Sequence, residues 1–150
     1  MSLIGLDFGE KRVGVAIAEP DSYVSVPLKV LSAKDRAGLE AYLKALACER
    51  RAKAIVVGVP IQTDGKEGDM ALKVKGWAIS ISSALNLPVH FVDERFTSKE
   101  AKRAMAEAGA HAKKRKSLSD AVSAALILDT FISRSKKFKR GASAKGEVIL

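Results

Sequence analysis

Residues 3–18 read LIGLDFGEKRVGVAIA, and this stretch decides how the rest of the chain is arranged. Two apolar runs, 3–6 and 13–18, are joined by a short polar turn that contains glycine, a pattern typical of a β-hairpin. Asp7 directly follows the first run, at the end of a strand that should be buried. A carboxylate there is costly unless a cation or hydrogen bonds compensate it. We therefore expect Asp7 to face such groups.

Two other carboxylates stand in similar places. Glu94 follows Asp93 and the apolar run 89–92, and Asp120 precedes the apolar stretch 121–128. If these acids meet Asp7, three oxygen ligands without histidine or thiolate suit Mg²⁺ or Mn²⁺. Two such ions about 3.5 to 4 Å apart can activate water in phosphodiester cleavage. Spacing alone leaves the alternative open: most carboxylates are surface residues, and Asp120 could simply favour the start of a helix.

Length and composition predict one domain that remains in the cytoplasm. The chain has 150 residues, of which 47% are hydrophobic, enough for one buried core. No apolar run approaches the roughly 20 residues of a membrane span, and the first residues, MSLIGLDF, lack the pattern of a signal peptide. Cys48 is the only cysteine, so no intramolecular disulfide is expected, in keeping with a reducing compartment.

The charge predicts a polyanionic partner, most simply nucleic acid. Lys and Arg number 26 against 17 Asp and Glu, which gives a net charge of +9 and a pI near 9.8. Two basic runs stand out, 113–116 (KKRK) and 134–140 (RSKKFKR). For the second run, phosphate contact and a solvated tail remain equal alternatives.

The rest of the chain alternates strands with helices. Hydrophobic spacing predicts strands at 24–31, 54–58 and 89–92, and helices at 35–51 and 70–85. Pro27 favours an edge position for the strand 24–31. Thr97 with Glu100, and Ser117 with Asp120, have the form of capping boxes, which predict helices at 98–108 and from about 117 to 132. This order predicts an α/β protein with helices on both faces of a mixed sheet.

Four blocks of sequence carry a resemblance to a known family: LIGLDFGEKRVGVA, VVGVPIQTDGKEG, FVDERFTSKEA and KKRKSLSDAVSAALIL, in that order. They resemble the YqgF family of Holliday junction resolvase-like proteins, members of the ribonuclease H-like superfamily, over nearly all of residues 3–132. The resemblance implies a ribonuclease H-like fold, with a central five-stranded mixed sheet flanked by helices on both faces and an acidic metal site at its edge. It implies Asp7, Glu94 and Asp120 as the catalytic and metal-binding residues, with Asp93 ranked below Glu94. Gln62 and Phe96 depart from the family pattern, in loops only.

The activity that the resemblance implies is that of a hydrolase, a metal-dependent nuclease using Mg²⁺ or Mn²⁺. Maturation of the precursor of small-subunit (16S) ribosomal RNA is favoured, since it needs one site and a basic surface. Resolution of four-way DNA junctions is the alternative, and it normally requires a symmetric dimer. A non-catalytic nucleic-acid-binding protein, with structural acids, is the rival from another class.

The expected nucleic-acid contacts are basic residues near the acids. Lys11 and Arg95 flank them, and could equally pair with the carboxylates or hold a phosphate. The full expected set is Lys11, Arg12, Arg95, Lys113, Lys114, Arg115 and Lys116. We expect a single nuclease domain over residues 1–133, a flexible basic tail over 134–150, no membrane association, and a monomer or weak homodimer.

Overall fold

A five-stranded mixed sheet forms the centre of the molecule. The computed structural model describes residues 1–19, 21, 24–61, 66, 68–94 and 112–141, with backbone only for 112–119 and 136–141. The strands are β1 (Ser2–Phe8), β2 (Arg12–Glu19), β3 (Val24–Ser32), β4 (Ala52–Val59) and β5 (Val89–Asp93), in the order β3-β2-β1-β4-β5. The first three strands are antiparallel, and β1, β4 and β5 are parallel.

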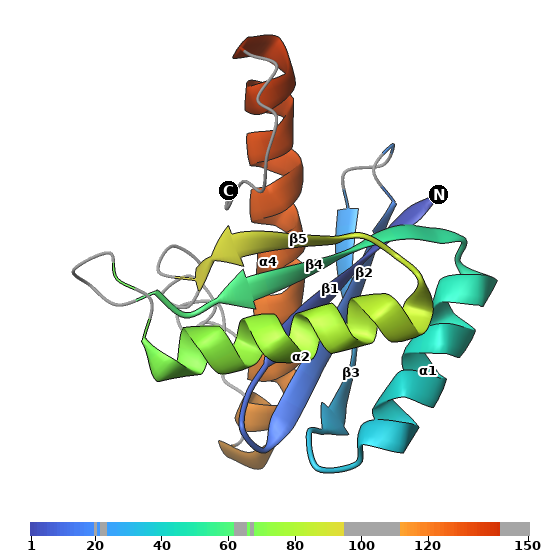
Figure 1. The fold of residues 1–150 in the computed structure, drawn as a ribbon, viewed down its shortest axis with the longest axis vertical. Helices are drawn as coiled ribbons and strands as arrows, with labels where there is room; N and C mark the ends of the chain where they lie inside the picture. The colour runs from blue at the N-terminus through green and yellow to red at the C-terminus, as the bar shows by residue number, and fades with distance from the viewer. Residues whose placement is uncertain (20, 22–23, 62–65, 67, 95–111, 142–150) are drawn as a thin grey trace.

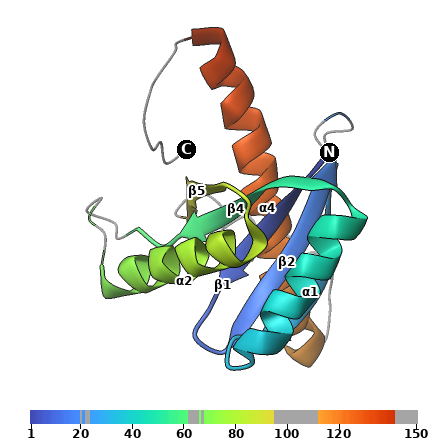
Figure 2. The same ribbon diagram turned by 45° about the vertical axis from the view of Figure 1, so that its right-hand side comes forward.

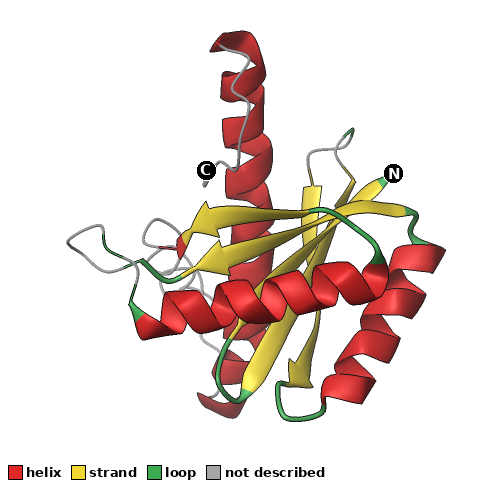
Figure 3. Cartoon of the chain, viewed as in Figure 1, coloured by secondary structure: helices red, strands yellow, loops and turns green. Residues whose placement is uncertain are grey.

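Helices cover both faces of this sheet. The helices α1 (Arg36–Glu49) and α2 (Asp69–Leu85) lie in front of it in Figure 1, and α4 (Ala112–Gly141) crosses behind it. The turned view in Figure 2 and the colouring by secondary structure in Figure 3 show the same three layers. The predicted mixed sheet with helices on both faces is confirmed.

Strand alternation divides the core into two apolar layers. Along β1, Ile4 and Leu6 pack toward α1 and α2, whereas Leu3 packs toward α4. Successive residues of a strand point to opposite faces of the sheet, so residues of β1 that are two places apart share a face. Asp7, two places after Gly5 and four after Leu3, therefore lies on the α4 face.

The edge position predicted for β3 is confirmed. It is the outermost strand, next to β2, and Pro27 stands opposite Ala16 where the register shifts. Proline is tolerated there because an edge strand or bulge does not require its missing N–H.

The helix α2 packs one face against the sheet. The residues Ala71, Val74, Ala78 and Ile81 are fully buried, whereas Leu72 is 60% exposed. The small side chains let α2 lie close to the sheet, so the larger Leu72 falls outside the contact. Trp77 packs against the core, with the centre of its ring 5.9 Å from that of Phe8.

The helix α4 is longer at both ends than predicted. It begins at Ala112, so Ser117 and Asp120 lie inside it and the predicted capping box is wrong. It continues through the basic run to Gly141, past the expected end at 132, and this part projects beyond the sheet (Figures 1 and 2). The helix expected at 98–108 lies outside the described residues. Within the described chain, no helix has the length and apolar character needed to span a membrane.

Candidate metal centre

Asp7 lies near the end of β1, on the sheet face that α4 covers. It stands opposite Gly14 of β2 in the antiparallel pair. Its side chain is half-buried, between a core layer and the open end of the strand.

The alternation along β5 brings Glu94 rather than Asp93 to Asp7. Val92 packs in the α4 layer and Phe91 in the opposite layer. Glu94 follows β5 two places after Val92 and shares its face, whereas Asp93 is 6% exposed and points the other way. This geometry supports ranking Glu94 above Asp93.

Asp7 and Glu94 form a hydrogen-bonded carboxyl pair, in which Glu94 donates to Asp7. Burial raises the pKa of Glu94 to about 10, helped by this hydrogen bond and by the charges of Asp7 and Asp93. Burial also raises the pKa of Asp7, and the negative charge of Asp120 adds to the effect. At neutral pH the pair therefore keeps a proton that separated carboxyls would have lost.

Asp120 lies beside this pair but is bound elsewhere. Its Oδ2 accepts a hydrogen bond from Arg12 Nε at 2.9 Å, and both side chains are partly exposed to solvent. Over the described residues, no group of three His, Cys, Asp or Glu side chains is arranged to hold a metal ion. The structure thus brings two of the three predicted acids into contact and places the third close by, paired with Arg12.

Two strand glycines make this convergence possible. A Cβ added at Gly14 would collide with the backbone oxygen of Asp120, and one at Gly58 would lie 2.7 Å from Glu94 Cγ. Any side chain at these positions would push α4 or Glu94 away from Asp7. Sequence reasoning missed both residues, although a glycine inside a strand pattern often signals the close approach of another backbone.

The predicted basic residues have different outcomes. Lys11 is exposed in the turn between β1 and β2, and Arg12 is held by Asp120. Arg95 lies outside the described residues. The run Lys113, Lys114, Arg115 and Lys116 lies in α4 before Asp120, where the structure describes the backbone alone.

The sheet order and an acidic pair at the strand ends define a ribonuclease H-like nuclease fold. Thermus thermophilus RuvC in complex with a Holliday junction substrate matches with a TM-score of 0.58 at 20% identity, over 91% of this chain and 96% of that one. A fowlpox virus resolvase, also solved with Holliday junction DNA, matches with a TM-score of 0.54 at 12% identity, over 90% and 99%. At these identities the likeness establishes the fold.

The family follows from closer sequence similarity. The model of the RuvX family, described as Holliday junction resolvase, matches residues 1–134, and the chain belongs to that family. A protein of Maridesulfovibrio salexigens named "Putative pre-16S rRNA nuclease" is 35% identical over 135 residues, covering 90% of this chain and all of that one. A Cereibacter sphaeroides protein of the same name is 38% identical over 133 residues, covering 89% and 83%. The chain is a nuclease of this family, a phosphodiester hydrolase.

Proposed function

We propose that this nuclease uses a divalent cation, Mg²⁺ or Mn²⁺, to mature the precursor of 16S ribosomal RNA, with Asp7, Glu94 and Asp120 as its metal-binding and catalytic residues. The observation that carries the proposal is the hydrogen-bonded contact between the largely buried carboxyl groups of Asp7 and Glu94, which come from two different strand ends. Burial and the short distance between the two carboxyl groups disfavour their ionised forms. A cation bound between them would stabilise both carboxylates and take the place of the proton.

The donor set fits a hard divalent cation. All three side chains supply carboxylate oxygens, the ligands that Mg²⁺ and Mn²⁺ prefer. Asp7 and Glu94 would hold the ion from the two strand ends, and Asp120 would join them by leaving Arg12. When bound, such an ion lowers the pKa of a coordinated water and stabilises charge on the phosphate oxygens.

The protein's own residues then have distinct tasks. Asp7 and Glu94 give up their shared proton before they can act as two anionic ligands. Arg12, once released by Asp120, has a guanidinium suited to a phosphate oxygen at the same site. Lys11, exposed in the adjacent turn, adds a second positive charge for the incoming strand.

Ribosomal RNA is the proposed substrate because the relatives of 35% and 38% identity carry that name. One site per chain is enough for such a reaction, so a monomer in the cytoplasm would serve. The family description and the fold neighbours favour four-way DNA junctions as the second candidate. That reaction requires two sites in a symmetric dimer.

The experiment is a cleavage panel that holds a 16S precursor fragment, a single-stranded RNA and a four-way DNA junction, each with Mg²⁺ or Mn²⁺. Wild type is compared with Asp7→Asn, and with Asp129→Asn as a matched control, because Asp129 is an exposed carboxylate of α4. We expect cleavage of the RNA precursor by wild type and by Asp129→Asn, and its loss in Asp7→Asn.

Two results would change the conclusion. Cleavage of the junction alone would replace RNA maturation by junction resolution and would require a dimer in solution. If both the wild type and Asp7→Asn bound the substrates and neither cut them, the protein would be a nucleic-acid-binding protein with structural acids.

A further inference from the structure

A stacked pair of aromatic rings lies at the end of β5 away from Glu94. The rings of His90 and Phe131 are 5.0 Å apart, with an interplanar angle of 28°. His90 is exposed on the edge strand β5, and Phe131 is half-buried on α4. Aromatic rings at a strand edge with solvent beside them are the usual platform for an unpaired base.

A bulge in β4 brings a positive charge to this pair. Ser2 stands opposite Ala52 and Leu3 opposite Ala54, so Lys53 is an extra residue in its strand. Bulges commonly change the direction of a side chain. Burial and the charge of Lys53 both lower the pKa of His90, so the imidazole is neutral at neutral pH and lies near the ammonium.

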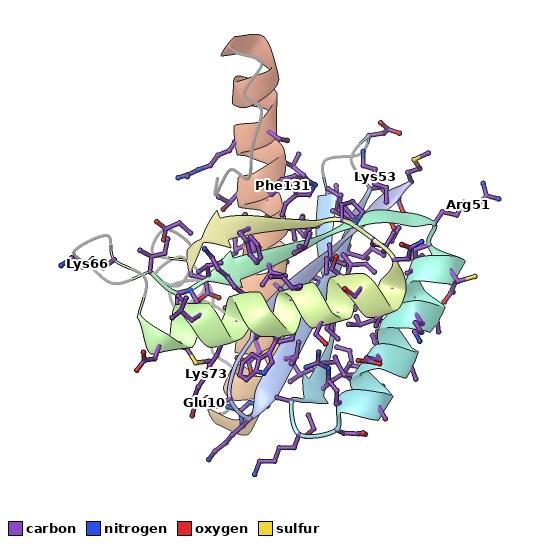
Figure 4. All side chains as sticks on the ribbon, in the orientation of Figure 1. Glu10, Arg51, Lys53, Lys66, Lys73 and Phe131 are labelled. Carbon is purple, nitrogen blue, oxygen red and sulfur yellow. The ribbon has the colours of Figure 1, made fainter. Side chains whose placement is uncertain are left out.

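The sequence of α4 is also basic beyond Phe131. Past Phe131 the helix carries the run RSKKFKR, which ends at 140, and this part of α4 projects beyond the sheet (Figures 1 and 2). Figure 4 shows Phe131 and Lys53 toward the end of the molecule from which α4 projects, and Glu10 of the β1–β2 turn at the opposite end.

The separation from the acids suits a second contact on one strand. His90 and Glu94 are four strand residues apart, roughly 13 Å, and Asp120 and Phe131 are eleven helical residues apart, roughly 16 Å. At about 3.4 Å per nucleotide along a helical strand, this span corresponds to roughly four or five nucleotides. An extended single strand would cover it with fewer.

We propose that His90, Phe131 and Lys53 form a second nucleic-acid site, where an unpaired base stacks on the two rings and a neighbouring phosphate binds the lysine. We refer to these three residues as the stacking site. The inference rests on the proposed function, since it assigns a strand-binding step to the same nuclease. It makes the substrate a single strand, or a junction with an unpaired region, rather than a continuous duplex.

The test measures binding without cleavage, so it is independent of the activity. The full-length protein carrying Asp7→Asn is titrated in chelator with short RNA and DNA single strands that carry 2-aminopurine at successive positions. Phe131→Leu removes the ring and keeps apolar packing, and Lys53→Gln removes the charge. Lys44→Gln on α1 is the control for charge, and Ile79→Ala, an exposed apolar residue of α2, is the control for apolar area.

We expect Phe131→Leu to weaken single-strand binding by about tenfold, within the range for one stacked base, and to abolish the quenching of one 2-aminopurine position. Lys53→Gln should reduce the salt slope by about 0.7. Both controls and a blunt duplex should be unaffected. A loss with RNA alone would identify RNA as the ligand.

Unchanged affinity and unchanged quenching in Phe131→Leu would overturn the proposal, as would an equal loss of duplex binding. The failure of the nuclease proposal gives a different result, since that appears in the cleavage panel, as substrates that wild type binds but does not cut or as cleavage insensitive to Asp7→Asn. A folded Phe131→Leu protein is verified by its circular dichroism spectrum and its melting temperature.

Discussion

At the scale of single residues, the central feature is the contact of Asp7 with Glu94. The pair holds one proton because burial disfavours the charged form of both carboxyls and the charge of Asp7 disfavours ionisation of Glu94, whereas the hydrogen bond that Glu94 donates favours the ionised form of Asp7. Such a pair is unfavourable for the folded state at neutral pH without a cation. Carboxyls with strongly shifted pKa values are typical of functional sites, which supports the metal centre proposed above.

The pair predicts that the metal-free protein loses stability as pH rises. The folded pKa of Glu94, about 10, lies above its ordinary value of 4.5, so the folded state binds more protons than the unfolded state between these values. Stability therefore falls with increasing pH throughout that window. We expect a lower melting temperature at pH 9 than at pH 7 in chelator, measured by differential scanning calorimetry.

The control for this prediction is Glu94→Gln, which removes the titration and should flatten the dependence between pH 7 and pH 9. Mg²⁺ added to wild type should raise the melting temperature more at pH 9, where fewer protons compete with the ion. An equal loss of stability in wild type and Glu94→Gln would show that other groups cause it.

At the scale of elements, α4 assembles the site by crossing the sheet. Residues of the helix meet a different strand at each step: Asp120 at Gly14 of β2, Leu128 at Gly5 of β1, Ile127 at Gly58 of β4, and Phe131 at His90 of β5. The helix can approach the sheet this closely because three of these strand positions are glycines, which have no side chain. The distance between α4 and the sheet therefore sets how far Asp120 lies from Asp7 and Glu94.

This packing predicts that Gly14→Ala destabilises the protein. The new methyl group would collide with the backbone oxygen of Asp120, and neither the strand nor the helix can give way cheaply. We expect a loss of about 2 to 3 kcal/mol in the free energy of unfolding, measured by urea titration, together with a loss of nuclease activity.

Gly76→Ala is the matched control, because a Cβ at this α2 position meets nothing within 4 Å. It should stabilise the protein by about 0.5 to 1 kcal/mol through helix propensity and leave activity unchanged. Equal effects of the two substitutions would show that α4 does not rest on Gly14.

Most of the helices and strands could be predicted from the sequence, because the strands and α1 follow simple hydrophobic periodicities. Leu39, Leu43 and Leu46 are buried as their spacing predicts. The start of α4 could not be predicted, since Ser117 and Asp120 match a capping pattern that the longer helix overrides. The pairing of Arg12 with Asp120 joins residues 108 positions apart, which no local pattern encodes.

At the scale of the whole molecule, the acidic centre sits in a strongly basic protein. The net charge of +9 favours a polyanionic partner, whereas the carboxyls at the strand ends form a local acidic centre. Membership of the RuvX family and the ribonuclease H-like fold agree with this division. The sequence predicted the charge and the family, but not where the surface carries its positive charge.

The charge predicts strong salt dependence of nucleic-acid binding. Each phosphate contact on a single strand contributes about 0.7 to the slope of log K against log salt. We expect Lys11→Gln to reduce the slope by about that amount and Lys44→Gln to leave it unchanged, measured by fluorescence anisotropy at several salt concentrations. An unchanged slope for Lys11→Gln would remove Lys11 from the contact surface.

The most direct test of the central claim is the binding of Mn²⁺, followed by electron paramagnetic resonance in wild type, Glu94→Gln, Asp120→Asn and the control Asp129→Asn. If the three acids hold a divalent cation, Glu94→Gln and Asp120→Asn should each weaken binding at least roughly tenfold, since even indirect partners of a metal contribute 10- to 100-fold. Asp129→Asn should bind as wild type does. Equal Mn²⁺ affinity in all four folded proteins would contradict the account.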